Sequence, residues 1–226
     1  MPLTFSSLES GGHKRRPSFW LRHAGAHHFS LHSCPTQEIG AFSGMPIVLA
    51  SSSPRRRELL ADAGVVFEVM HSPAEEVHDA SMTPDALCEL NAALKAEAVA
   101  LIRPDATVIG SDTLVFIDDI PLGKPATMEE ARSMLRRLSG RTHRVCTGVC
   151  IIYPGGRKSV FHDITEVTFL LLDDVAINCY FSQVNPLDKA GAYGIQECGE
   201  QIIAGISGSY ETVMGLPVAM VVKALE

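Results

Sequence analysis

The sequence has no apolar run long enough to cross a bilayer and no excess of basic residues. Its longest nearly unbroken apolar stretch is Val213–Val222, whereas a membrane helix needs about 20 residues. The 226 residues contain 19 Lys and Arg against 26 Asp and Glu, which gives a formal net charge of −7. Proteins that bind duplexes generally carry a basic surface. The sequence therefore predicts neither a membrane protein nor a binder of nucleic acid polymers.

Paired cysteines and glycosylation acceptors are also missing. The six cysteines include no Cys-x-x-Cys pair, and no Asn-x-Ser/Thr sequence occurs. Cys146 and Cys150 fall four residues apart in a predicted strand, and this spacing separates them by about 13 Å. That separation is too large for a disulfide bond. We therefore expect a reducing compartment, and the cytoplasm is the predicted location.

The first 44 residues differ in composition from the rest of the chain. With four basic and two acidic residues they carry a charge of +2, they hold five of the nine histidines, and they show no helix or strand period. We predict a disordered extension over residues 1–44 and a single domain over residues 45–226. A start codon placed too early, before Met45, and an organelle-targeting peptide stay open as alternatives.

Short buried-type strands alternate with helices along residues 45–226, and a turn at Pro154–Arg157 joins two long strands into a hairpin. This order favours an α/β fold with a mixed sheet flanked by helices. The predicted strands are Ile47–Ala50, Val65–Met70, Thr107–Gly110, Leu114–Ile117, Arg144–Tyr153 and Lys158–Leu172.

The predicted helices begin at recognisable caps. Ser53 and Pro54 open one helix, and Thr127 with Glu130 forms a capping box for another. Further helices are expected around residues 173–182 and after the turn at 215–217. A helix that opens at Thr83 is expected to bury one stripe of apolar residues, formed by Leu87, Leu90, Leu94, Ala98 and Leu101.

Residues Ser51–Arg57 join the first strand to the first helix. Unpaired backbone N–H groups and the positive end of the dipole make a helix N-terminus suitable for anions. Three serines and three arginines in this segment add donors for phosphate oxygens. Cations are unfavourable at this end of a helix, so a purely structural helix would rarely carry three arginines there. The segment predicts a phosphate-binding turn.

Three other segments contain candidate functional residues, although each is also compatible with an ordinary turn. Asp112 is placed at the end of a predicted strand, where α/β proteins keep catalytic groups, and it could hold a metal or orient a water molecule. Lys124 could neutralise phosphate, although no Walker sequence surrounds it. The small residues of Asp188–Gln196 allow a ligand to approach, and Gln196 could read a base edge. His143 has no catalytic partner spacing, so we expect a structural role.

Taken together, these segments resemble the Maf family of nucleoside triphosphate pyrophosphatases. Any single motif is weak, but the motifs follow the family's order and cover essentially all of residues 46–226. The matching stretches run over residues 49–56, 110–113, 122–125, 138–143, 165–167, 188–196, 208–210 and 213–217.

The resemblance implies hydrolysis between the α- and β-phosphates of a nucleoside triphosphate, with Mg²⁺ or Mn²⁺ as cofactor. The products would be the monophosphate and pyrophosphate, in a house-cleaning role. It also implies an elongated, ITPase-like α/β fold with two lobes, an active-site cleft between them and a homodimer. Thr113, which follows the family's catalytic aspartate, is typical of the branch that prefers dTTP and UTP.

The resemblance also assigns roles to individual residues. Asp112 matches the general base, Lys95 and Lys124 match lysines that reach the phosphates, and Glu76 and Asp112 match the metal ligands. The other matches are the substrate-binding residues Ser51, Arg55, Arg56 and Lys189 and the base-preference residues Arg55, Thr113 and Gln196.

The chain departs from the family pattern at three places. Family members commonly have Asp-Ile-Asp-Glu where this chain has Ser72–Glu76, so Glu75 stays an alternative to Glu76. A common Glu-Pro before the Asp-Lys-Ala-Gly run is Asn185-Pro186 here. A common glycine after Ile-Gln is Glu197 here. Two rival functions stay open: a pyrophosphatase for 7-methyl-GTP or other non-standard nucleotides, and a nucleotide-binding regulator of cell division with little catalysis.

Overall fold

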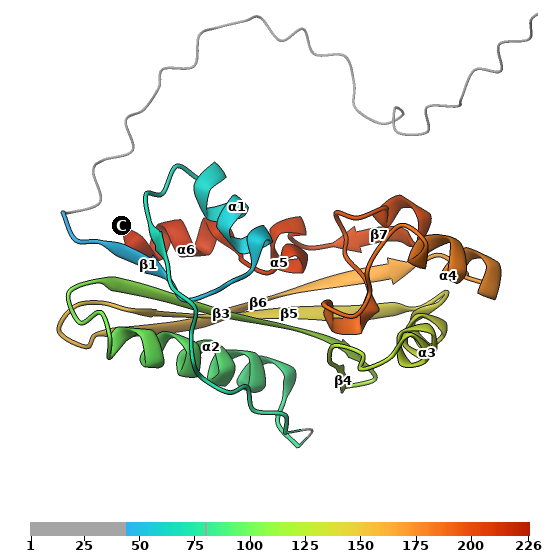
Figure 1. The fold of residues 1–226 in the computed structure, drawn as a ribbon, viewed down its shortest axis with the longest axis horizontal. Helices are drawn as coiled ribbons and strands as arrows, with labels where there is room; N and C mark the ends of the chain where they lie inside the picture. Colours follow the sequence, from blue (N-terminus) through green and yellow to red (C-terminus); the bar gives the residue numbers. More distant parts are fainter. Residues whose placement is uncertain (1–43, 80) are drawn as a thin grey trace, which may run out of the picture. The chain divides into compact units, whose positions relative to one another are not determined.

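The computed structural model describes residues 44–79 and 81–226, so the predictions for residues 1–43 lie outside the described residues. A mixed seven-stranded sheet forms its centre (Figure 1), in the order β2-β1-β3-β5-β6-β7 with β4 paired to β3. The predicted mixed α/β sheet is confirmed. The strands are β1 (Ile47–Leu49), β2 (Glu68–Val69), β3 (Thr107–Ile117), β4 (Ile120–Leu122), β5 (Thr142–Ile152), β6 (Lys158–Phe169) and β7 (Ile203–Ser207).

Helices cover both faces of this sheet. Helix α2 lies against one face, and α1, α5 and α6 lie on the other (Figure 1). In the part of the chain that the structure describes, no helix is both long and apolar enough to cross a membrane. The helices are α1 (Pro54–Asp62), α2 (Pro84–Ala100), α3 (Met128–Leu138), α4 (Asp174–Phe181), α5 (Tyr210–Met214) and α6 (Val218–Leu225), with 3-10 turns η1 (Ala190–Ala192) and η2 (Gly199–Gln201).

The predicted caps of α1 and α3 are confirmed, whereas the Thr83 side chain makes no capping hydrogen bond at the start of α2. The Ser53 side chain accepts a hydrogen bond from the Arg56 N–H, and Thr127 accepts one from Glu130. The strand predicted at Val65–Met70 shortens to β2, whose two residues are exposed. Strand β7 and helix α5 were not predicted, because their segments are short and show no clear period.

The prediction that a stripe of large apolar residues forms the buried face of α2 is wrong. Leu101 is 85% exposed, and Leu90 and Leu94 are only half-buried. Leu87 is buried as predicted, but most of the buried face is made of small or polar side chains. They are Cys88, Asn91, Ala92, Ala93, Ala96 and Val99.

Two glycines of the sheet explain this orientation. A Cβ atom added to Gly110 of β3 would lie 2.3 Å from the Ala92 carbonyl oxygen, and one added to Gly148 of β5 would lie 2.4 Å from the backbone of Cys88. The backbone of α2 therefore rests almost directly on the strands. Only small side chains fit at so short a distance, which is why the leucines turn away.

Strand β3 also differs from its prediction, because it continues through Asp112 instead of ending before it. Strand β5 pairs with β3 from Val108 to Phe116 and keeps the chain extended. On the opposite edge, β1 pairs only as far as Ile109 and β4 begins pairing at Val115. Asp112 therefore lies within a strand, beside a gap in the strand pairing along one edge.

Two buried clusters occupy opposite ends of the long strands β3, β5 and β6. One contains Val115, Val145 and Val167 and packs against α3 and α4. The other contains Ile109 and Val149 and packs against α1, α5 and α6. The two ends of the sheet thus carry separate cores.

His143 lies inside the first core, as its structural interpretation predicted. Its ring is 2% exposed and packs edge-on against Phe169 and Tyr193, with centroids 5.0 and 5.4 Å away. Its Nε2 atom lies 2.7 Å from the Tyr193 hydroxyl, while Nδ1 has no hydrogen-bond partner. Burial lowers the pKa of His143 to about 4, so the folded protein holds this imidazole neutral.

The free energy of unfolding should fall as the pH drops from about 6.5 to about 4. In this range the unfolded chain binds a proton at residue 143 that the folded chain does not bind. The loss should reach roughly 3 kcal/mol. The free energy of unfolding, measured by urea denaturation at several pH values in this range, should fall less steeply with decreasing pH in the double variant His143→Phe/Tyr193→Phe. This variant removes both polar groups. An equal pH dependence of the free energy of unfolding in the variant and in the unmodified protein would contradict a neutral, buried His143.

Gly148→Ala should lower the free energy of unfolding by about 1–3 kcal/mol, because overpacking must move the backbone of α2. Gly205→Ala is the matched control, since a Cβ there meets no atom within 4 Å. Urea denaturation measures both. Equal stability of the two variants would show that α2 does not depend on this close approach.

Candidate active site

A cavity of about 830 Å³ opens beside the gap in the strand pairing along β3. Such a volume lies in the range of small-molecule sites. Segments far apart in the sequence form its walls: the turn before α1, the loop at 71–78, the middle of β3, the turn after β4, the region of η1 and the end of α5. The sequence-predicted residues among its lining are Ser51, Arg55, Arg56, Glu76, Lys95, Asp112, Thr113, Lys124 and Lys189.

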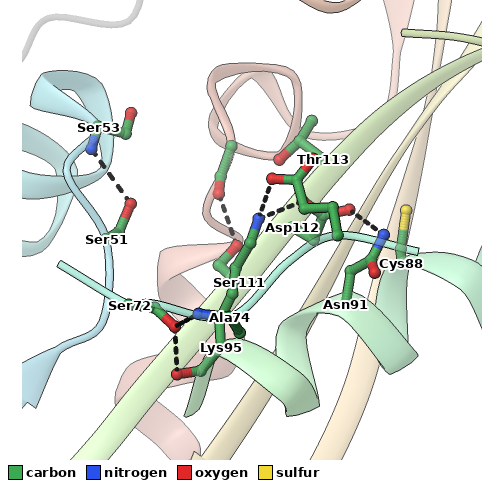
Figure 2. A network of polar contacts seen from close by, with 12 residues as sticks. Ser51, Ser53, Ser72, Ala74, Cys88, Asn91, Lys95, Ser111, Asp112 and Thr113 are labelled. Carbon is green, nitrogen blue, oxygen red and sulfur yellow. Dashed lines mark hydrogen bonds and ion pairs between the residues drawn. The ribbon is translucent and has the colours of Figure 1, made fainter. Parts of the chain in front are cut away.

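Lys95 joins two carboxylates in this cavity. Its Nζ atom lies 2.6 Å from Oδ1 of Asp112 and 2.6 Å from Oε1 of Glu76. The Asp112 side chain is only 5% exposed, and that of Lys95 is 13% exposed. Figure 2 shows the Lys95 ammonium group directed at the Asp112 carboxylate. A single cation therefore brings the predicted base and the predicted metal ligand together.

The Glu76 carboxylate is ionised in this arrangement. Partial burial opposes its ionisation, but the hydrogen bond and charge of Lys95, helped by the charge of Lys124, outweigh burial and lower its pKa. Glu75 is exposed and is not part of the cavity wall. The structure thus places Glu76, rather than Glu75, against Lys95.

The side chains of the turn before α1 bind one another. Ser51 Oγ accepts hydrogen bonds from the Ser53 N–H at 3.2 Å and from the Arg56 guanidinium at 3.3 Å (Figure 2 draws the first). Ser51 is buried, whereas Arg55 is half-buried at the cavity wall. The turn is thus held rigidly at the end of α1 that suits an anion.

Arg56 is tied into the fold. Its guanidinium donates to the Gly215 carbonyl oxygen at 2.8 Å and to Thr113 Oγ1 at 2.9 Å. Burial lowers the pKa of Arg56, while the charges of Asp112 and Glu76 oppose that effect. Gly215 adopts φ +116°, and a Cβ there would lie 3.2 Å from both Arg56 and Thr113. Arg56 therefore fixes Thr113 relative to the turn.

Lys189 is 4% exposed and already has three acceptors. Its ammonium group donates to the Asn185 carbonyl oxygen and to Asp188, both at 2.8 Å, and lies 3.1 Å from Glu197. Glu197 also lies 3.7 Å from Arg55. This glutamate, which replaces the family's usual glycine, therefore joins two cations at the cavity.

Two other predicted residues differ in their placement. Lys124 is exposed and lines the cavity. Gln196 is exposed in a turn after Ile195 and is not part of the cavity wall. The geometry thus brings Lys124 to the site and leaves Gln196 outside its lining.

The donor set suits a hard divalent cation that also binds phosphate. Among the described residues, no group of three or more His, Cys, Asp or Glu side chains could hold a metal ion. The two carboxylates that converge on Lys95 remain. Mg²⁺ sites commonly use one or two carboxylates together with substrate phosphates, so Glu76 and Asp112 fit such an ion.

Asn91 is a polar residue of this site that the sequence analysis missed. It lies on α2 one turn before Lys95, is 1% exposed, and donates from Nδ2 to Asp112 Oδ2 at 3.3 Å (Figure 2). An amide at a helix position that faces the sheet was the available signal. The assumed stripe of leucines directed attention to another face of the helix.

The family model described as "Maf-like protein" matches residues 46–226. A dTTP/UTP pyrophosphatase of Akkermansia muciniphila is 54% identical over 180 residues, which cover 80% of this chain and 95% of the relative. A protein of the same name from Bacillus velezensis is 46% identical over 180 residues, with the same coverage of both chains.

Among solved structures, a nucleoside-triphosphatase, or dITP/XTP pyrophosphatase, of Mycobacterium abscessus aligns with a TM-score of 0.40 and 17% identity. The alignment covers 55% of this chain and 74% of that one. The family model spans most of the sequence, and the curated relatives match it along nearly their whole length. The chain belongs to the Maf family.

Proposed function

We propose that the protein hydrolyses the α–β phosphoanhydride bond of dTTP and UTP to give the nucleoside monophosphate and pyrophosphate. The observation that carries this proposal is the Asp112 carboxylate, buried at the cavity and fixed by Lys95. The names of the curated relatives support the same reaction and the same substrates. The protein is accordingly a hydrolase of phosphorus anhydrides.

The residues of the cavity have different roles in this reaction. Asp112 accepts a proton from the attacking water and holds that water in line with the α-phosphorus. The Ser51–Arg56 turn and Lys124 neutralise phosphate oxygens and the charge that develops on the leaving pyrophosphate. Lys95 keeps the Asp112 and Glu76 carboxylates at a fixed separation.

We also propose Mg²⁺ or Mn²⁺ as the cofactor, held by Glu76 and Asp112. When bound, it would supply a Lewis acid for the phosphate oxygens. Lys95 holds these two carboxylates close to each other, and its ammonium group would have to share their oxygens with the ion. The homodimer and the cytoplasmic location stay predictions from the sequence.

Preference for a pyrimidine base is supported by the names of the curated relatives and by Thr113, which the resemblance assigns to the branch that prefers dTTP and UTP. Arg56 and Thr147 both contact Thr113 Oγ1, at 2.9 and 3.0 Å, so the hydroxyl has a fixed orientation beside the cavity. Arg55 lies at the same wall. The role of Gln196 in base preference stays a prediction.

A substrate panel tests this function. With Mg²⁺ or Mn²⁺, UTP and dTTP should give the monophosphate and pyrophosphate, and 7-methyl-GTP and ITP should react at least tenfold more slowly in kcat/KM. Product chromatography and a pyrophosphate assay measure both. Faster turnover of 7-methyl-GTP would favour the first rival function, and nucleotide binding without pyrophosphate release would favour the regulator.

Asp112→Asn should lower kcat for UTP by about 10²–10⁴-fold, the usual contribution of a general base. The amide has the size of the carboxylate, so circular dichroism should show an unchanged fold. Asp105→Asn is the matched control, because Asp105 pairs with Arg103 outside the cavity. Turnover near that of the unmodified protein in Asp112→Asn would refute the role of this residue.

Lys124→Ala should lower kcat/KM for UTP by about 10-fold or more, because a hydrogen bond to a charged group contributes about 1.5–3 kcal/mol. Lys158→Ala provides the control, since Lys158 pairs with Glu97 on the surface. Steady-state kinetics of both variants decide the point. Unchanged kcat and KM in Lys124→Ala would remove this lysine from the site.

A further inference from the structure

Asn91 places a polar amide at a buried position, which an apolar side chain could fill without the free-energy cost of burying polar atoms. It is 1% exposed, and its neighbours on the same face of α2 include Cys88 and Ala92. An unsatisfied buried amide is costly, but this one makes three hydrogen bonds across the helix surface. What it binds therefore explains why it is there.

Two of these hydrogen bonds bind the backbone N–H and carbonyl groups of a single residue, Val77. Asn91 Oδ1 accepts from the Val77 N–H at 2.8 Å, and Nδ2 donates to the Val77 carbonyl oxygen at 3.1 Å. Val77 directly follows Glu76, so this contact sets the position of the Glu76 backbone above α2. Ser72 anchors the other end of the loop, because its hydroxyl donates to the Lys95 carbonyl oxygen at 3.1 Å.

The third hydrogen bond reaches the proposed base. Asp112 receives Lys95 at Oδ1 and Asn91 at Oδ2, so each carboxylate oxygen has its own donor from α2 (Figure 2). Asn91 and Lys95 are four residues apart and therefore share one face of the helix. Two donors at fixed positions hold the carboxylate in one orientation.

We propose that Asn91 is a positioning residue, which couples the orientation of Asp112 to the position of Glu76. Through one amide it holds the backbone that carries Glu76 and one oxygen of Asp112. This inference rests on the proposed function, because it assigns Asn91 to the hydrolytic step. Asn91 itself does not line the cavity, so it acts through these two residues.

The test compares Asn91→Leu, which removes all three hydrogen bonds, with Asn91→Asp, which keeps the acceptor for Val77 but replaces both donors by a carboxylate that repels Asp112. At saturating Mn²⁺, both should lower kcat for UTP about 10–100-fold, the usual effect of a residue that orients metal ligands. The calorimetric Kd of α,β-methylene-UTP measured without a divalent cation should change less than threefold, because the phosphate-binding cations are retained.

Ser139→Ala is the matched control. The Ser139 hydroxyl also binds both the N–H and the carbonyl group of one residue, Leu172, but Ser139 lies outside the cavity. The Ser139→Ala variant should have a lower free energy of unfolding and an unchanged kcat for UTP. Unchanged kcat in both Asn91 variants, or an equal loss of kcat in Ser139→Ala, would overturn the proposal.

A further measurement separates this inference from the proposed function. Hydrogen exchange followed by mass spectrometry should show faster exchange at residues 72–78 in Asn91→Leu than in the unmodified protein, whatever the substrate. If the unmodified protein releases no pyrophosphate, the proposed function fails while this contact can still be tested. Unchanged exchange at residues 72–78 would overturn the coupling itself.

Discussion

Helix α2 can rest on β3 and β5 only because Gly110 and Gly148 present no side chain to it. This short distance lets two residues of the helix, Asn91 and Lys95, reach a carboxylate that is rooted in the sheet. A side chain at either glycine would lift the helix and break these contacts. The geometry of Asp112 is therefore a consequence of backbone packing, and the catalytic proposal depends on it.

The same region explains how an acidic protein offers a site for a polyanion. The chain has a net charge of −7, yet basic residues gather at one cavity. Several of them are already paired: Arg56 binds Gly215 and Thr113, and Lys189 binds Asp188. These paired cations build the walls. Arg55 lies 3.7 Å from Glu197, and Lys124 forms no salt bridge with the described residues, so these two side chains are the best placed to meet phosphate.

Much of the fold could be predicted from the sequence, because caps and ordered motifs depend on local chemistry, and nine of the predicted site residues line one cavity. Ser53 and Thr127 form the caps expected of them. The buried face of α2 could not be predicted, because apolar periodicity favours large leucines and cannot detect glycines on a strand far along the chain. Asn91 was missed for the same reason, since its partners are set by tertiary packing.

Under the proposed function, a water molecule attacks the α-phosphorus of the nucleotide. Hydrolysis of UTP in water labelled with oxygen-18, followed by mass spectrometry of both products, tests it most directly. The label should enter the nucleoside monophosphate, and the pyrophosphate should stay unlabelled. Label in the pyrophosphate, or release of orthophosphate in its place, would contradict the account.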